Sequence, residues 1–323
     1  MTDSRLWFST ARGIQKCGNF TRYRRIEIHN RTAVILPHGL GGRTTNQLIR
    51  HVWLWSLMAR FDSLDGHWPG ISEWGLDCSL EYDYSPEYSR QLRHKRLTRT
   101  IELDGNREPI QLGAQISLCH PKYVRISGNG LRASNLLDGR ERALQEVDFK
   151  FQDVCCSNLY TEMSLDDQLV VHVRAGDLFR EKGLLRRDMF PLPISHLKTL
   201  RKTFDLPFTF VGEFHTNREY FDALRQNFQD STFLGPNCLH DDFRLLMRAK
   251  KLAISFSTFS WCAAWLSSKV EIAVIPLGGF FHPLIRPDID LTSGLDYRFH
   301  FIGIKSIQLS RAQLKDYAWL LHK

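Results

Sequence analysis

The second half of the chain alternates between short runs of β-branched residues and longer amphipathic stretches. Its clearest run, Leu169–Arg174, is typical of a strand that is buried on both faces of a sheet. After this run the pattern predicts, in order, helix 193–203, strand 208–211, helix 217–228, helix 240–249, strand 252–255, helix 258–267, strand 271–275 and helix 311–321. Such alternation indicates a parallel sheet covered by helices. The second half is therefore predicted to form one Rossmann-like domain.

The first half shows the same classes of element less regularly. A strand is predicted at 32–36, followed by a glycine-rich turn and then an amphipathic helix. The apolar positions of this helix, at 4-3-4 spacing, are Leu48, Val52, Trp55 and Ala59. Further elements are expected as strands 100–103, 110–112 and 123–126 and helix 139–151, whereas the aromatic-rich residues 62–95 show little periodicity. We expect an α/β protein with two domains, 1–155 and 156–323, which a length of 323 residues allows.

Composition narrows the class of partner. The net charge of +8 and the pI of about 9.2 favour an anionic partner, such as a phosphorylated ligand. No nucleic-acid-binding motif accompanies the basic residues, so a nucleic acid partner is not expected.

No apolar run approaches the roughly 20 residues that span a bilayer. The seven cysteines form no Cys-x-x-Cys pair. A cytoplasmic location is expected, or the Golgi lumen if an N-terminal anchor precedes the sequence; the oligomeric state stays open.

Polar side chains follow Leu169–Arg174 at its carboxyl end. His172 and Arg174 are two residues apart and would share one face of the strand, and Asp177 follows in a Gly-Asp turn. Open α/β sheets bind ligands at this edge. The segment therefore indicates an anion-binding site, with an ordinary strand end and a solvated arginine as the alternative.

A second polar segment follows the predicted strand 252–255. Ser257, Thr258 and Ser260 lie at the expected start of a helix, where one hydroxyl is enough for a cap. The free N–H groups and the dipole of a helix start also bind phosphate. Both segments belong at the carboxyl edge of one sheet, so we expect them to converge on one anion. Glu213, just after the predicted strand 208–211, would suit the paired donors of guanine, or is a plain surface residue.

These segments resemble the fucosyltransferase superfamily that uses GDP-fucose. His172-Val-Arg-Ala-Gly-Asp177 resembles its His-x-Arg-Arg-x-Asp segment, and Ser255-Phe-Ser-Thr-Phe-Ser-Trp261 resembles the helix-start motif of the α1,2-fucosyltransferase branch. Residues 241–247 and 249–252 resemble the segments that precede this motif in that branch. His38-Gly-Leu-Gly-Gly, followed by Asn46-Gln47, is similar to its N-terminal glycine-rich loop, although longer.

The resemblance implies a GT-B architecture, in which two Rossmann-like domains face each other across a cleft. It implies an inverting transferase that moves L-fucose from GDP-fucose to a glycan hydroxyl, with α1,2 linkage favoured, and without a cofactor or an essential metal. In this reading Arg174 holds the diphosphate and helps it to leave. The other residues of the donor site would be His172, Asn46, Glu213, Ser257, Thr258 and Ser260. An inverting transfer also benefits from a base for the acceptor hydroxyl, for which His38 and Asp177 are the candidates.

One departure from the family pattern keeps other functions open. Ala175 stands where the family has a second arginine, so Arg174 would meet the phosphate charge alone or together with Arg43. A non-catalytic protein that binds a sugar nucleotide or a carbohydrate on the same fold is one alternative, and a transferase that uses another nucleotide sugar is a second. A metal-dependent, single-domain glycosyltransferase would need an Asp-x-Asp motif. Asp288-Ile-Asp290 has that form, but it follows a proline and is expected to be a loop.

Overall fold

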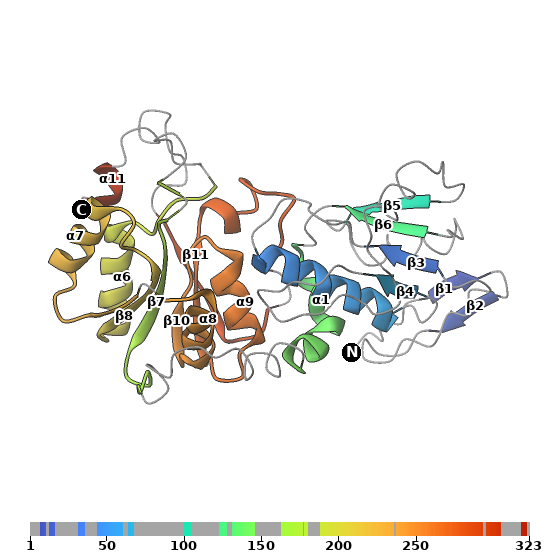
Figure 1. Ribbon diagram of the computed structural model, residues 1–323, viewed down its shortest axis with the longest axis horizontal. Helices are drawn as coiled ribbons and strands as arrows, with labels where there is room; N and C mark the ends of the chain where they lie inside the picture. The colour runs from blue at the N-terminus through green and yellow to red at the C-terminus, as the bar shows by residue number, and fades with distance from the viewer. Residues whose placement is uncertain are drawn as a thin grey trace. The chain divides into compact units, whose positions relative to one another are not determined.

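Two parallel β-sheets organise the chain, one in each of its two units, Met1–Val154 and Cys155–Lys323 (Figure 1). A separate antiparallel pair, β1 (Trp7–Thr10) and β2 (Gly13–Lys16), belongs to the first unit. The predicted α/β class is confirmed. The structure is a computed structural model and describes residues 7–10, 13–16, 32–35, 44–60, 64–67, 100–104, 123–127, 131–145, 163–176, 178–179, 188–235, 237–292, 295–304 and 318–321.

The second unit contains a six-stranded sheet in which every neighbouring pair is parallel. Its strands in chain order are β7 (Leu169–Arg174), β8 (Phe208–Glu213), β9 (Thr232–Leu234), β10 (Lys251–Ala253), β11 (Ile272–Leu277) and β12 (Phe299–Gly303). In space they run β12-β11-β10-β7-β8-β9. The first strand of the unit, β7, is thus central. Strands β8 and β9 follow it on one side of the sheet, and β10, β11 and β12 then follow on the other side. This is the strand order of a Rossmann fold.

Helices cover both faces of this sheet (Figure 1). On one face lie α6 (Ile194–Phe204) and α7 (Arg218–Asn227), with the C-terminal helix α11 (Ala318–Leu321) packed against both. On the other face lie α8 (Leu239–Arg248) and α9 (Thr258–Leu266). All four of these longer helices were predicted to within a few residues. Strands β9 and β12 were not predicted. The final helix is described only from residue 318, and the rest of its predicted range lies outside the described residues.

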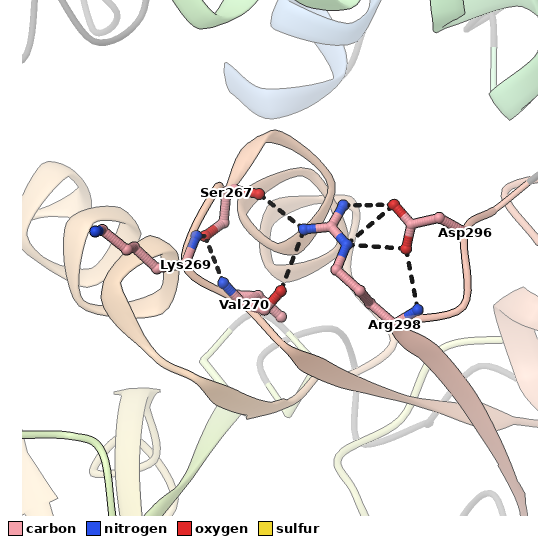
Figure 2. Close-up of polar contacts among 5 residues, drawn as sticks. All are labelled: Ser267, Lys269, Val270, Asp296 and Arg298. Atoms are coloured by element: carbon pink, nitrogen blue, oxygen red, sulfur yellow. Dashed lines mark hydrogen bonds and ion pairs between the residues drawn. The ribbon is translucent and has the colours of Figure 1, made fainter.

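An arginine fastens the edge strand β12 to the end of α9. Figure 2 shows the Arg298 guanidinium between Asp296 and the carbonyl oxygens of Ser267 and Val270. Nη1 donates to Ser267 O at 2.9 Å and to Val270 O at 3.2 Å, and Nη2 donates to Asp296 Oδ2 at 2.7 Å. The Ser267 hydroxyl accepts from the backbone N–H of Lys269 and Val270, which fixes the turn between α9 and β11. The side chain therefore holds the amino edge of the sheet together.

Replacing Arg298 by alanine is expected to lower the free energy of unfolding by about 1–3 kcal/mol, because two backbone carbonyls lose their charged donor. Urea denaturation measures the change. Arg218 is the matched control, since its side chain is 94% exposed and pairs with Asp222 at 3.7 Å. The change for Arg218→Ala should stay within about 0.5 kcal/mol. Equal losses for the two variants would contradict the role given to Arg298.

The first unit contains a four-stranded parallel sheet in the order β4-β3-β6-β5. The strands are β3 (Thr32–Ile35), β4 (Leu64–His67), β5 (Thr100–Asp104) and β6 (Tyr123–Ser127). Three of them match predicted strands, whereas β4 falls in the segment that showed little periodicity. The predicted strand 110–112 lies outside the described residues.

Helix α1 (Thr44–Arg60) is buried around most of its circumference. Leu48, Val52 and Trp55 are at most 3% exposed, as their spacing predicted, but Ala59 is exposed and that part of the prediction is wrong. The reason is that Arg60 in the same turn points inward, where it donates to Ser134 O at 3.0 Å and pairs with Asp138.

The predicted helix 139–151 is also wrong in its start. Helical structure begins earlier, in α4 (Ala133–Leu136), η2 (Leu137–Gly139) and residues 140–145. Gly139 does not begin a helix but allows a close approach to α1, because a Cβ there would lie 2.2 Å from Val52 O. Its N–H donates to Ser56 Oγ at 2.7 Å. A helix start and a tight packing contact both favour glycine, so the sequence alone did not distinguish them.

Candidate functional site

The point where the strand order reverses lies between β7 and β10. These strands are hydrogen-bonded neighbours, with Val170 opposite Leu252 and Val171 opposite Ala253. The connection after β7 leads to β8 on one side, and the connection after β10 leads to β11 on the other. Loops that diverge in this way leave a crevice at the carboxyl edge, which is where open α/β sheets bind ligands. The two polar segments picked out in the sequence follow these two strands.

Arg174 joins the two segments. Its Nη1 donates to Phe256 O at 3.2 Å, a contact between residues 82 positions apart. The side chain is half-buried at the carboxyl end of β7, and Phe256 lies one residue before the cap of α9. The structure therefore places the Arg174 guanidinium next to the start of α9, at the point where the strand order reverses. The two predicted segments could bind one anion only if they lay close together in this way.

His172, which precedes Arg174 by two residues on β7, is buried. The residue is 5% exposed, Nδ1 lies 2.7 Å from Ser255 Oγ, and the ring centroid lies 5.5 Å from that of Phe259. Burial, together with the nearby charge of Arg174, lowers the pKa of His172 to about 3. The imidazole is therefore neutral at pH 7 and does not act as a cation toward phosphate. The geometry gives no support to its predicted contact with the donor.

The three hydroxyls at the start of α9 have different surroundings. Ser257 is the N-cap residue, and its hydroxyl accepts from Phe259 N at 3.2 Å. Ser260 is fully buried: its hydroxyl accepts from Ser255 N at 3.3 Å and donates to Ser257 O at 3.5 Å. Thr258 is half-exposed in the first turn of the helix. The cap thus uses more than one hydroxyl internally, and a phosphate role stays a prediction that the structure favours least for Ser260.

Glu213 ends β8 and lies across the chain that leaves β7. A Cβ added to Gly176 would come within 2.5 Å of its carboxylate, so the absence of a side chain at residue 176 makes room for Glu213. In the register of the sheet Glu213 is opposite Arg174. Glu213 is therefore a neighbour of Arg174 at the carboxyl edge of the sheet. Its contact with the nucleoside remains a prediction.

Ala175 is completely buried. The position that carries the second arginine in the family pattern is thus inside the protein here. Arg286 does not replace that charge, because Asp188 and Asp288 bind it, with Arg286 Nη1 at 2.8 Å from Asp188 and Nη2 at 2.7 Å from Asp288.

The sequence did not indicate a polar pair at the start of α8. Asn237 Nδ2 donates to Asp242 Oδ1 at 2.8 Å. Burial raises the pKa of Asp242 to about 6, against the effect of this hydrogen bond, and the charges of Asp241 and Glu213 raise it further. Asp242 and Glu213 therefore place two interacting carboxyl groups near the carboxyl end of β8. Only the paired aspartates at 241–242 hint at it in the sequence, and acidic residues are common in any first helical turn.

Three predicted residues lie outside the described residues: His38, Arg43 and Asp177. Asn46 is half-buried in the first turn of α1, in the first unit. Of the predicted site residues, the structure brings together Arg174, His172, Ser257, Ser260 and Glu213 around the carboxyl ends of β7, β8 and β10.

The Asp288–Asp290 triplet lies in turns after β11, as expected for a loop. The Asp288 carboxylate accepts two hydrogen bonds from Arg286, at 2.9 and 2.7 Å. Within the part of the chain that the structure describes, no three His, Cys, Asp or Glu side chains are grouped as metal ligands. No helix among the same residues is long and apolar enough to cross a bilayer.

Comparisons with known proteins find distant structural similarity. No protein-family model matches the chain, and neither does any curated protein. The E. coli heptosyltransferase WaaC with ADP has 12% sequence identity and a TM-score of 0.44, over 89% of this chain and 98% of that chain. WaaC with ADP-2-deoxy-2-fluoro heptose has 12% identity and a TM-score of 0.43, over 89% and 97%. The glycosyl transferase family 9 structure from Veillonella parvula DSM 2008 has 9% identity and a TM-score of 0.41, over 85% and 86%. These similarities are too low to bear on function.

Proposed function

We propose that this protein is an inverting glycosyltransferase that moves L-fucose from GDP-fucose to a glycan hydroxyl. The observation that carries the proposal is the contact of Arg174 with the turn before α9, at the reversal point of a Rossmann sheet. The Arg174 guanidinium, the start of α9 and the Glu213 carboxylate all lie at the carboxyl edge of the six-stranded sheet. This is the set of groups that a nucleoside diphosphate needs: positive charge for its phosphates and an acceptor for its base or ribose.

The chemistry of glycosyl transfer fits these groups. Negative charge builds on the departing diphosphate while the sugar passes through an oxocarbenium-like state. A guanidinium and backbone N–H groups that are already in place stabilise this charge more in the transition state than in the bound donor, and only such differential stabilisation raises turnover. Arg174 and the first turn of α9 are assigned this task. His38 and Asp177 remain the candidates for the base that accepts the proton of the acceptor hydroxyl.

A ligand panel tests the proposal. We expect GDP and GDP-fucose to raise the melting temperature of the protein by mass action, and UDP-sugars and ADP-sugars to raise it less. GDP-fucose with a panel of oligosaccharide acceptors should then release GDP, and EDTA should not stop the release. A shift with another nucleotide class alone would show the donor assignment to be wrong. Binding of GDP-fucose without release of GDP for any acceptor would favour the non-catalytic alternative, which the alanine at residue 175, in place of the second arginine of the family pattern, supports.

A further inference from the structure

A chain of buried hydrogen bonds runs beneath the turn that precedes α9. His172 Nδ1 and Ser255 Oγ share one bond of 2.7 Å, between residues 83 positions apart. Ser255 N donates to Ser260 Oγ at 3.3 Å, and Ser257 N donates to Ser255 O at 2.7 Å. Ser255 is 1% exposed and Ser260 is fully buried. A side chain of the central strand β7 thus contacts the turn through Ser255, whose backbone is itself bonded to Ser257 and Ser260.

The imidazole of His172 is fixed on its other sides as well. The Phe259 ring lies against it, with centroids 5.5 Å apart and an interplanar angle of 36°. Phe259 in turn packs against Phe243 of α8 at 5.2 Å. On the β8 side is Gly212, where a Cβ would come within 3.2 and 3.3 Å of the ring atoms Cδ2 and Nε2. The ring therefore lies between Gly212 of β8 and Phe259 of α9.

His172 and Arg174 act on the same short turn from the same strand. His172 reaches Ser255, and Arg174 reaches the carbonyl oxygen of the next residue, Phe256. A turn that is held at two consecutive residues has little freedom to move relative to the strand. Because the donors of the site must lie within a few tenths of an ångström of their working positions, this double attachment has a direct effect on transition-state stabilisation.

We propose that His172 is a positioning residue, which acts through Ser255 to set the turn 255–258 relative to Arg174. The inference rests on the proposed function, since the turn and Arg174 are the groups assigned to the leaving diphosphate. His172 itself touches no ligand in this scheme. It follows that its loss lowers kcat far more than it raises the KM for the donor, because the binding groups remain present but are displaced from the geometry of the transition state.

A double-mutant cycle tests this inference. His172→Phe keeps an aromatic ring against Phe259 and removes the nitrogen, and Ser255→Ala removes the hydroxyl with little change in volume. Each is expected to lower kcat for GDP release by about 10–100-fold, with a change of less than about threefold in the donor KM. The double variant should be no slower than the slower single variant, since both remove the same bond. His172→Asn retains a side-chain hydrogen-bonding group and should recover part of the loss.

His196→Phe is the matched control. His196 is also a 5% exposed histidine of the second unit, and burial lowers its pKa to about 4, but it lies in α6, the helix between β7 and β8. This variant should lower the melting temperature without changing kcat at a temperature where the protein is folded. If His172→Phe does not fold, Ser255→Ala alone must still show the loss in kcat.

The outcomes separate the inference from the proposed function. If the wild-type protein releases GDP but folded His172→Phe or Ser255→Ala keeps its full kcat, the inference is wrong and the proposed function stands. Multiplicative effects of the two substitutions would also overturn the inference, because the residues would then act independently. If the wild-type protein releases no nucleotide from any donor, the proposed function fails and the inference fails with it.

Discussion

Replacing Arg174 by alanine is expected to lower the release of GDP from GDP-fucose by about 100–1,000-fold. The reason is that its guanidinium would stabilise charge that develops only as the diphosphate leaves. The side chain is half-buried and donates to Phe256 O, and loss of this hydrogen bond should lower the free energy of unfolding by about 1 kcal/mol. Initial rates at saturating donor, together with urea denaturation of the same preparations, measure the two effects.

Arg298→Ala is the control for this experiment. Arg298 also donates to backbone carbonyls, but at the opposite, amino edge of the same sheet. Its loss should reduce stability more than that of Arg174 and leave turnover unchanged under conditions where the protein is folded. Arg174→Lys should remain well below wild type, because an ammonium group does not reproduce the fork of a guanidinium. Wild-type turnover in Arg174→Ala would exclude Arg174 from the reaction.

Gly212→Ala is expected to have the largest effect on stability, a loss of about 3 kcal/mol or more. Gly212 has φ +117°, which side-chain-bearing residues rarely adopt, and a Cβ there would lie 2.4 Å from Val173 O. The added methyl group would push β7 and β8 apart beside the imidazole of His172. Urea denaturation should show a lower midpoint.

Gly303→Ala is the matched control for Gly212→Ala. Gly303 lies in β12 of the same sheet, and a Cβ there would meet nothing within 4 Å. Its substitution should change the free energy of unfolding by no more than about 0.5 kcal/mol. Similar losses for the two variants would mean that glycine is not required at residue 212 by its backbone conformation or by the contact with Val173.

The helices and strands that the sequence predicted are those in which buried apolar residues recur at a regular spacing. β7 is buried at five consecutive positions, and α7 and α8 have clear apolar faces, so their periods were visible. β9 has only three residues, and β12 is an edge strand with Phe301 44% exposed, so neither has the pattern of a buried strand. Short or half-exposed strands are recognised only when their neighbours in the sheet are known.

For the site, the sequence predicted which segments meet but not which atoms bond. The meeting of Arg174 with the turn before α9 follows from two strands that share an edge. That Ser260 points inward did not follow, because α9 is buried on nearly every side and gives no polar face by which to orient it. The bond between His172 and Ser255 depends on side-chain positions that only the packed sheet defines. The same holds for the pKa values of His172 and Asp242, which are set by burial.

The reversal of strand order has a consequence for folding. The two sides of the site come from segments more than 80 residues apart, at the end of β7 and in the turn that follows β10. Local contacts cannot bring them together, so the site forms only after the crossover through β8, β9 and α8 is complete and the long loop has been closed. A nascent chain that has made β7 to β9 would contain Arg174 without its partner turn. Nucleotide binding would then report that β10 has paired with β7, and a bound diphosphate would hold together the segments that follow these two strands.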